Sequence, residues 1–473
     1  MKKHLSGFMF VLLTLGLVIP MGSSLATPTA ESLVILHPHS TDFAAHVIDE
    51  FRVWYQAETG NSITVTTSEK YSGDCWADVE LWNGTNPEAD VWWGGGEYYF
   101  EEARRADLLH PYNVTEDENV TDILGGWHLK DDSGDYDEVM WYAAAMSGFG
   151  IIYNKEYLTD EGLDIPETWE DLADPQYFDH ITMTDPDLSG STVAIVKQLL
   201  MAMAPAGAIT DSTDTTDAWA LWVKISGNVD TFLTSSSKVP ADVAEGNAGV
   251  GLCIDYYARD RMLTDDNIGF NYGEATTVSP DPAGIIKGAA NLDNAKMFMD
   301  FLIGTEGQSL VGDFRTPANF KAATASHIPK AFTSTGAVNT ASFPVIDNYN
   351  AALDGAIHSN AEALFHYWIV EAHDELKQAW EQINTLTDAT EKADAIEVLT
   401  VLPEDFDGTM ESLDGLAYRD SNATASWTAH GVAQFNEAYE LAGGGAGVGT
   451  PGFELIVLLI SLIVFIPLFR KKE

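Results

Sequence analysis

The sequence predicts an α/β fold with mainly parallel sheets, because short apolar runs alternate with segments of helical periodicity. Leu33–Leu36 is an apolar run of strand length, and the next segment, residues 43–55, repeats apolar side chains every three to four positions. Ala89–Trp93 is another strand, and Gly94–Gly96 separate it from a helix at Glu97–Ala106. In sheets of this kind ligands bind beyond the carboxyl ends of the strands, where these loops lie.

A second strand–turn–helix unit carries the clearest binding signal. Asp185 and Pro186 form a turn after the apolar segment Ile181–Met183, and the apolar-periodic helix Val193–Met203 follows. Between them, Ser189–Thr192 supply a serine N-cap, a glycine and two further hydroxyls. The first N–H groups of a helix have no internal partner, and the helix dipole favours negative charge there. The local physics therefore fits a carboxylate, a phosphate or another small anion, and an ordinary capped helix is the alternative.

The composition excludes several classes of partner. The chain has 72 acidic and 24 basic residues and a formal net charge of −48, which disfavours binding to nucleic acid or to anionic lipid. Its 473 residues, of which 45% are hydrophobic, favour two lobes or domains with large cores. The two cysteines, Cys75 and Cys253, leave open whether one disulfide forms.

Both ends of the chain predict targeting to the cell exterior. Residues 1–26 read as a signal peptide, with two lysines, an apolar centre and a small-residue cleavage site. Residues 442–450 form a Gly-rich linker, and residues 451–473 contain Pro451-Gly452-Phe453, the apolar run Leu455–Phe469 and a basic end. We expect this tail to anchor the chain, by a transmembrane helix or after its replacement by a lipid, on the extracellular face of the membrane. It resembles the archaeal tripartite sorting signal with a Pro-Gly-Phe motif.

The order of several motifs over Ser32–Lys321 resembles the solute-binding proteins of ABC importers, the family that includes ferric-iron, thiamine, polyamine and phosphorylated-sugar binders. The motifs are Val34–Ser40, Ala89–Val91 with Gly94–Gly96, Gly150–Lys155, Pro166–Leu172 with Asp174-Pro175, Asp185-Pro186 with Ser189-Gly190, Glu245–Gly251 and Arg315–Pro317. The resemblance implies a type II periplasmic-binding-protein fold, in which two lobes clamp a ligand. It also implies that the receptor is a monomer and that it docks on a permease that a cytoplasmic ATPase drives.

The resemblance also implies a division of the chain. We expect residues 31–140 and 258–325 to form lobe 1 and residues 141–257 to form lobe 2. Residues 326–441 match the family poorly, and we expect them to be a helical extension that completes lobe 2, with a long amphipathic helix at Ala361–Ile383.

The expected ligand-binding residues come from the loops that would face the cleft. They are His39, Ser40, Gly94, Gly95, Ser147, Ser189, Gly190, Ser191, Thr192, Ser236, Asp255, Tyr256 and Tyr257. An organic anion or a phosphorylated sugar is the first ligand class, with Asp255 accepting hydroxyl hydrogen bonds.

Other functions remain as alternatives. Tyr256 and Tyr257 resemble the tyrosine pair that ligates ferric iron in part of the family, which makes iron, held with a synergistic anion, an alternative transported ligand; Asp255 departs from that pattern. A polyamine receptor or an extracellular enzyme is less favoured. The chain has no His-Glu-x-x-His, Gly-x-Ser-x-Gly or phosphate-loop motif, and we expect neither catalysis nor a resident cofactor.

Overall fold

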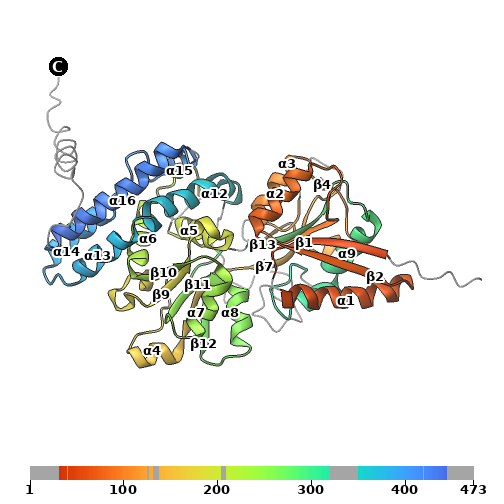
Figure 1. The fold of residues 1–473 in the computed structure, drawn as a ribbon, viewed down its shortest axis with the longest axis horizontal. Coiled ribbons are helices and arrows are strands. Elements are labelled where there is room, and N and C mark those ends of the chain that lie inside the picture. Colours follow the sequence, from red (N-terminus) through yellow and green to blue (C-terminus); the bar gives the residue numbers. More distant parts are fainter. Residues whose placement is uncertain are drawn as a thin grey trace, which may run out of the picture.

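The computed structural model of the protein describes residues 31–39, 41–124, 127–131, 138–203, 209–277, 279–319, 350–418 and 420–444. Two large sheets form the cores of two lobes that lie side by side, as Figure 1 shows. The predicted α/β class and two-lobed architecture are therefore confirmed. The expected signal peptide, Ser40 and the expected C-terminal anchor lie outside the described residues.

The first sheet has strand order β2-β1-β3-β13-β4, with β7 paired to β13. Its strands are β1 (Glu31–His37), β2 (Ile63–Glu69), β3 (Val91–Trp93), β4 (Leu109–His110), β7 (Tyr142–Ser147) and β13 (Ser279–Ile286). Alternate residues of β1 face opposite sides of the sheet. Ile35 packs with Phe51 of α1 (Thr41–Thr59) and Phe298 of α9 (Leu292–Ile303). Leu36 faces the other side, with α2 (Ser72–Trp82) and α3 (Glu97–Arg105).

The second sheet has strand order β10-β9-β11-β8-β12. Its strands are β8 (Phe149–Asn154), β9 (Ile181–Thr184), β10 (Val229–Leu233), β11 (Val250–Ile254) and β12 (Ile268–Asn271). One face packs on α7 (Val239–Ala244) and α8 (Asp255–Met262), and the other on α5 (Gly190–Ala202). Helix α6 (Thr216–Asn228) packs in turn on α5. The remaining elements include β5 (Ile123–Leu124), β6 (Trp127–His128), α4 (Lys155–Glu161) and α10 (Thr305–Val311).

The chain crosses between the lobes at β7–β8 and again at β12–β13. Only Gly148 separates β7, which pairs with β13 in the first sheet, from β8 in the second sheet. Two expected boundaries therefore change. Residues 142–147, expected in lobe 2, join the first sheet, and residues 258–271, expected in lobe 1, lie with the second sheet. The reason for the second change is that β12 pairs with β8, and α8 packs on both β11 and β12.

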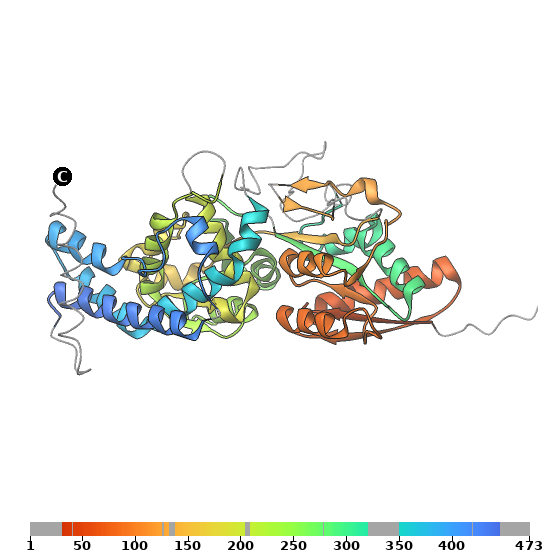
Figure 2. The ribbon, with the colours of Figure 1, turned by 90° about the horizontal axis from the view of Figure 1, so that it is seen from above.

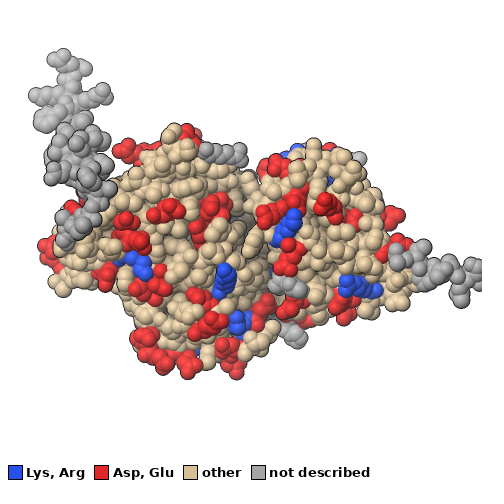
Figure 3. Space-filling model, in the orientation of Figure 1, with Lys and Arg blue, Asp and Glu red and all other residues tan. Residues whose placement is uncertain are grey.

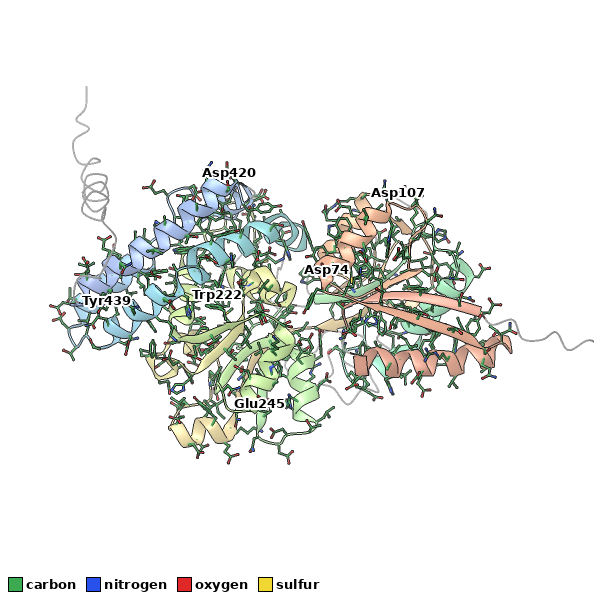
Figure 4. All side chains as sticks on the ribbon, viewed as in Figure 1. Asp74, Asp107, Trp222, Glu245, Asp420 and Tyr439 are labelled. Atoms are coloured by element: carbon green, nitrogen blue, oxygen red, sulfur yellow. The ribbon has the colours of Figure 1, made fainter. Side chains whose placement is uncertain are left out.

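The C-terminal extension packs against the second lobe, on the side away from the first sheet for most of its length (Figures 1 and 2). Its helices are α12 (Ala351–Phe365), α13 (His373–Asn384), α14 (Ala389–Leu399), α15 (Met410–Asp414) and α16 (Ser421–Leu441). A π-helical turn at His366–Val370 interrupts the helix that the sequence predicts at Ala361–Ile383. Figure 4 labels Asp420 and Tyr439 near the two ends of α16 and Trp222 in the lobe that the extension covers.

Tryptophan rings join the extension to α6. Trp222 lies with its ring centroid 5.4 Å from that of Phe365, and Trp380 Nε1 donates to Asn228 Oδ1 at 2.7 Å. Among the described residues no helix is long and apolar enough to cross a bilayer. Cys75 and Cys253 are both buried and unpaired, one in α2 and the other in β11.

We expect Gly227→Ala to destabilise the protein, because a Cβ atom at Gly227 would lie 2.6 Å from the ring of Trp380, where α6 meets the extension. Overpacking of this kind costs about 1–3 kcal/mol. Denaturant unfolding of the two proteins measures the loss. Gly190→Ala is the matched control, since a Cβ there meets nothing within 4 Å. A Gly227→Ala protein as stable as the wild type would show that α13 does not pack on α6.

Candidate ligand site between the lobes

Asp281 on β13 joins several expected site residues. Its Oδ1 accepts the Gly95 N–H at 3.0 Å, its Oδ2 accepts from Arg315 Nη1 at 2.5 Å, and His39 Nδ1 lies 3.8 Å from Oδ2. Gly94 and Gly95 have φ of 91° and 122°, which side-chain-bearing residues rarely adopt. A Cβ at Gly94 would also come within 2.3 Å of the His39 ring. The glycine loop after β3 is thus closely fitted to both Asp281 and His39.

The guanidinium of Arg315 spans the gap between the lobes. Its Cζ lies 4.2 Å from the ring centroid of Phe43 on α1 and 3.9 Å from that of Tyr256 on α8. The side chain is only 2% exposed. A cation between two aromatic faces is attracted by both rings. Arg315 therefore links helix α1 of the first lobe to helix α8 of the second.

Burial around Arg315 favours the uncharged forms of His39, Tyr256 and Tyr257. Burial lowers the pKa of His39 well below its usual value, and the Arg315 charge adds to the effect. Burial also raises the pKa of Tyr256 and of Tyr257. Burial raises the pKa of Asp281, although Arg315 and the loop N–H groups oppose that rise.

A second polar cluster surrounds Asp255 at the end of β11. Asp255 Oδ2 accepts the Gly148 N–H at 3.1 Å and the Tyr272 hydroxyl at 2.9 Å, and it lies 2.9 Å from Arg259 Nη2. Arg259 in turn donates to Thr316 Oγ1 at 3.1 Å, next to Arg315. The carboxylate is 0% exposed. Asp255 therefore holds the crossing strands together, and only its Oδ1 is left for another donor.

Several buried polar atoms at the lobe junction have no hydrogen-bond partner among the described residues. They are His37 Nε2, His39 Nε2, Ser147 Oγ, Gln198 Nε2 and Asp255 Oδ1. Ser147 ends β7, and Gln198 Oε1 accepts the Thr277 N–H at 3.1 Å just before β13. Buried polar groups in native proteins are almost always paired, so these atoms are positions at which a bound solute or water would supply a partner.

The N-terminal turn of α5 has the geometry that the sequence predicted. Ser189 is the N-cap and accepts the Thr192 N–H at 3.3 Å. Gly190 is exposed and Ser191 half-exposed, whereas Thr192 is 1% exposed. The first N–H groups of α5 are therefore open at Gly190 and Ser191, and Thr192 acts mainly in packing.

Of the expected residues, His39, Gly95 and Tyr256 contact Asp281 or Arg315, whereas Asp255 and Ser189–Thr192 have the separate contacts described above. Ser236 lies half-buried in a turn after β10, which is the edge strand of the second sheet. Ser40 lies outside the described residues. The sequence reasoning missed Asp281 and Arg259, and it quoted Arg315 only as part of a motif. The sequence signal for Arg315 was its place in the motif Arg315-Thr316-Pro317. Basic residues are also rare in this chain, which makes each of them more noticeable.

The ferric-iron alternative would use Tyr256 and Tyr257 of α8 as metal ligands. The rings of Tyr256 and Tyr257 lie 4.5 Å apart, and Arg315 covers one face of Tyr256. Burial raises the pKa of both phenols, so an iron ion that bound here would have to displace their protons. Within the described ranges, no three His, Cys, Asp or Glu side chains gather as a metal site.

A further polar group lies where α3, α5 and α12 meet. The rings of Tyr98 and His358 stack at 4.5 Å, and His358 Nδ1 lies 3.0 Å from Lys197 Nζ. Burial raises the pKa of the neighbouring Glu362 to about 7, with the charge of Asp187 as the next cause. The extension thus brings ionisable side chains to the seam between the lobes.

We expect Glu362→Gln to flatten the pH dependence of stability. The pKa of Glu362 is raised from 4.5 to about 7, so its contribution is fully present below pH 4.5 and is lost as pH rises through 7. Between pH 4.5 and pH 7 the wild type should therefore lose up to about 3 kcal/mol of unfolding free energy. The variant should not show this loss. Urea unfolding at pH 5 and pH 8 measures it, with Glu397→Gln on exposed α14 as control. Parallel pH profiles would contradict the assignment.

The comparisons with known proteins agree with this architecture. The phosphoglycerate transport regulatory protein PgtC of Salmonella typhimurium is 30% identical over 174 residues, 37% of this chain and 41% of that protein. The chain thus spans less than half the length of this relative. The structure of AfuA from Actinobacillus pleuropneumoniae, with exogenous fructose-6-phosphate bound, has a TM-score of 0.55 at 22% identity. That match covers 69% of this chain and 94% of AfuA.

A further solved structure supports the same fold. PotD, a spermidine/putrescine substrate-binding protein from Streptococcus pneumoniae, has a TM-score of 0.51 at 16% identity, over 70% of this chain and 97% of that one. The family model described as "Bacterial extracellular solute-binding protein" matches residues 86–335, which is more than half of the chain. This match includes the crossing strands, Asp281 and Arg315. The chain belongs to the bacterial extracellular solute-binding protein family.

Proposed function

We propose that this chain is the receptor of an ABC importer and that it captures a small anionic solute, an organic anion or a phosphorylated sugar, between its lobes. The observation that carries the proposal is the set of buried, unpaired polar atoms at the lobe junction, above all Ser147 Oγ and His39 Nε2. Bound solute would supply their partners and would contact both lobes at once. Ligand that bridges two lobes stabilises their closed arrangement by its differential affinity.

The charge distribution supports an anion. The few basic residues of this acidic chain include Arg315 and Arg259, which both lie where the strands cross between the lobes. Figure 3 shows carboxylates over both lobes, while some of the sparse basic groups on this face lie near the seam. The open N-terminal turn of α5 adds backbone donors at Gly190 and Ser191. Arg315 and Arg259 are each paired with a buried carboxylate, Asp281 and Asp255, so the N–H donors of α5 are the groups that favour an anion over a polyamine.

The relatives point to the same ligand class. PgtC is named for phosphoglycerate transport, and AfuA binds fructose-6-phosphate in its solved structure. PotD is named for polyamines, and its likeness to this chain, like that of AfuA, extends to the fold alone, so PgtC carries the argument from the relatives. We therefore propose a phosphorylated or carboxylated solute, with Ser147, Ser191, Gly95 and Arg315 around it. A permease and an ATPase would complete the importer.

We expect a phosphorylated solute to raise the melting temperature of the full-length protein in detergent. Binding at a hundredfold excess over the dissociation constant stabilises by about 2.7 kcal/mol. Thermal melting with phosphoglycerate, fructose-6-phosphate, inorganic phosphate, ferric citrate and putrescine tests the class. A shift with putrescine alone, or with ferric citrate but not with iron-free citrate, would refute the anionic assignment.

We expect Ser191→Ala to weaken binding of that solute, because a hydrogen bond to a charged group contributes about 1.5–3 kcal/mol. Ser309→Ala on α10 is the control, since its exposed hydroxyl bonds only the Thr305 carbonyl of its own helix. Calorimetric titration of both variants measures the change. Equal affinities for the wild type and Ser191→Ala would place the solute elsewhere.

We also propose that residues 451–473 tether the receptor to the cell surface, because an apolar run followed by a basic end follows the Gly-rich linker. Deletion of these residues should move the protein from the membrane fraction to the medium, which immunoblotting of the two fractions measures. A full-length protein that is already free in the medium, or a truncated protein that stays in the membrane fraction, would contradict the tether.

A further inference from the structure

Helix α12 of the extension contacts helix α3 of the first lobe, and neither helix is adjacent in sequence to the crossing strands. Tyr98 of α3 and His358 of α12 stack with ring centroids 4.5 Å apart and ring planes 3° apart. A Cβ atom built at Gly355, one turn earlier on α12, would lie 3.9 Å from Tyr98 Cδ2, which is van der Waals contact. Figures 1 and 2 show α12 next to the α2–α3 layer at the seam. The extension therefore reaches across the seam rather than only covering the second lobe.

The imidazole of His358 is held on the second lobe by a separate contact. Its Nδ1 lies 3.0 Å from Lys197 Nζ on α5, so Nδ1 accepts and the ring is neutral. Burial and the Lys197 charge both lower the pKa of His358, which agrees with this arrangement. The ring is 8% exposed and is thus fixed between Lys197 on one lobe and Tyr98 on the other.

The same helix is fastened to the turn that precedes α5. His366 Nδ1 lies 2.9 Å from Asp185 Oδ2, and this pairing raises the pKa of His366. Helix α12 runs antiparallel to α5, since His358 meets Lys197 and His366 meets Asp185 near the start of α5. A movement of α12 relative to α3 would therefore move the N-terminal turn of α5 with it.

We propose that α12 is an interlobe clasp, in which the stack of His358 on Tyr98 stabilises the closed arrangement of the lobes. This inference deepens the proposed function, on which its effect on affinity rests: the clasp raises the fraction of receptor that is ready to hold solute. The charged and titratable groups that face His358 are Lys197 on α5, Glu362 on α12, and Tyr98 and Tyr99 on α3. Protonation of His358 is not needed for the contact.

The size of the effect follows from the strength of an aromatic pair. The stabilisation from one aromatic pair changes an equilibrium constant by a factor of about two to ten. Apparent affinity scales with the fraction of receptor in the binding-competent state. Loss of the stack should therefore weaken solute binding by up to about tenfold and should lengthen the interlobe distance in the solute-free protein.

The experiment measures that distance by pulsed electron spin resonance on the full-length protein. Nitroxides on Val53→Cys of α1 in the first lobe and on Ile165→Cys after α4 in the second lobe report the interlobe distance, and both sites are exposed. The native Cys75 and Cys253 are buried and should stay unlabelled. Tyr98→Ala and His358→Ala are compared with Tyr98→Phe, which keeps the ring, and with His430→Ala, whose side chain bonds Val401 O within the extension.

The clasp predicts longer or broader distances in Tyr98→Ala and His358→Ala, no change in Tyr98→Phe or His430→Ala, and a double variant no worse than either single one. Unchanged distances in both alanine variants would overturn it, whatever the solute results. Where phosphoglycerate or fructose-6-phosphate binds the wild type, the affinity of both alanine variants should fall by up to about tenfold. If the wild type binds neither solute while both alanine variants show longer interlobe distances, the proposed ligand class is overturned and the clasp stands.

Discussion

The buried pair of Asp281 and Arg315 is the contact on which the rest of the junction depends. Asp281 belongs to the strand that pairs with β3, β4 and β7, and it orders the glycine loop and the ring of His39. Arg315 adds the link from Phe43 to Tyr256. Removing one partner of a buried pair leaves an uncompensated charge, which usually costs about 3–5 kcal/mol. A ligand that approaches this pair meets a prearranged set of donors rather than mobile side chains.

Electrostatics explains how so acidic a chain can bring its two lobes together. Carboxylates near the seam are held partly neutral: burial raises the pKa of Asp260 to about 6 and that of Glu362 to about 7. The Asp42 charge on α1 adds to the shift of Asp260, which lies on α8 of the other lobe. Each of these groups lowers the stability of the folded protein once it is ionised, so its stabilising contribution is lost as pH rises through the raised pKa. The buried arginines at the crossing strands act in the opposite direction.

The sequence predicted the fold class from patterns that are local, such as Leu33–Leu36 and the glycines after Ala89–Trp93. It also located the α5 turn, since an N-cap serine and a first-turn glycine are short-range signals. It missed the pairing of β12 with β8, because which strand pairs with which depends on contacts between distant segments. Asp281 was missed for the same reason: its partners, Gly95 and Arg315, are 186 and 34 residues away. The clasp of Tyr98 and His358 joins residues from α3 and α12 that no local pattern connects.

The most direct test of the ligand site is a crystal structure of the protein grown with the solute that raises its melting temperature most. We expect electron density for an anion at the lobe junction, within hydrogen-bond distance of Ser147 Oγ and of the Ser191 hydroxyl or N–H, with Arg315 beside it. Density for a metal ion bound by Tyr256 and Tyr257, or for a solute away from the crossing strands, would contradict the proposed site.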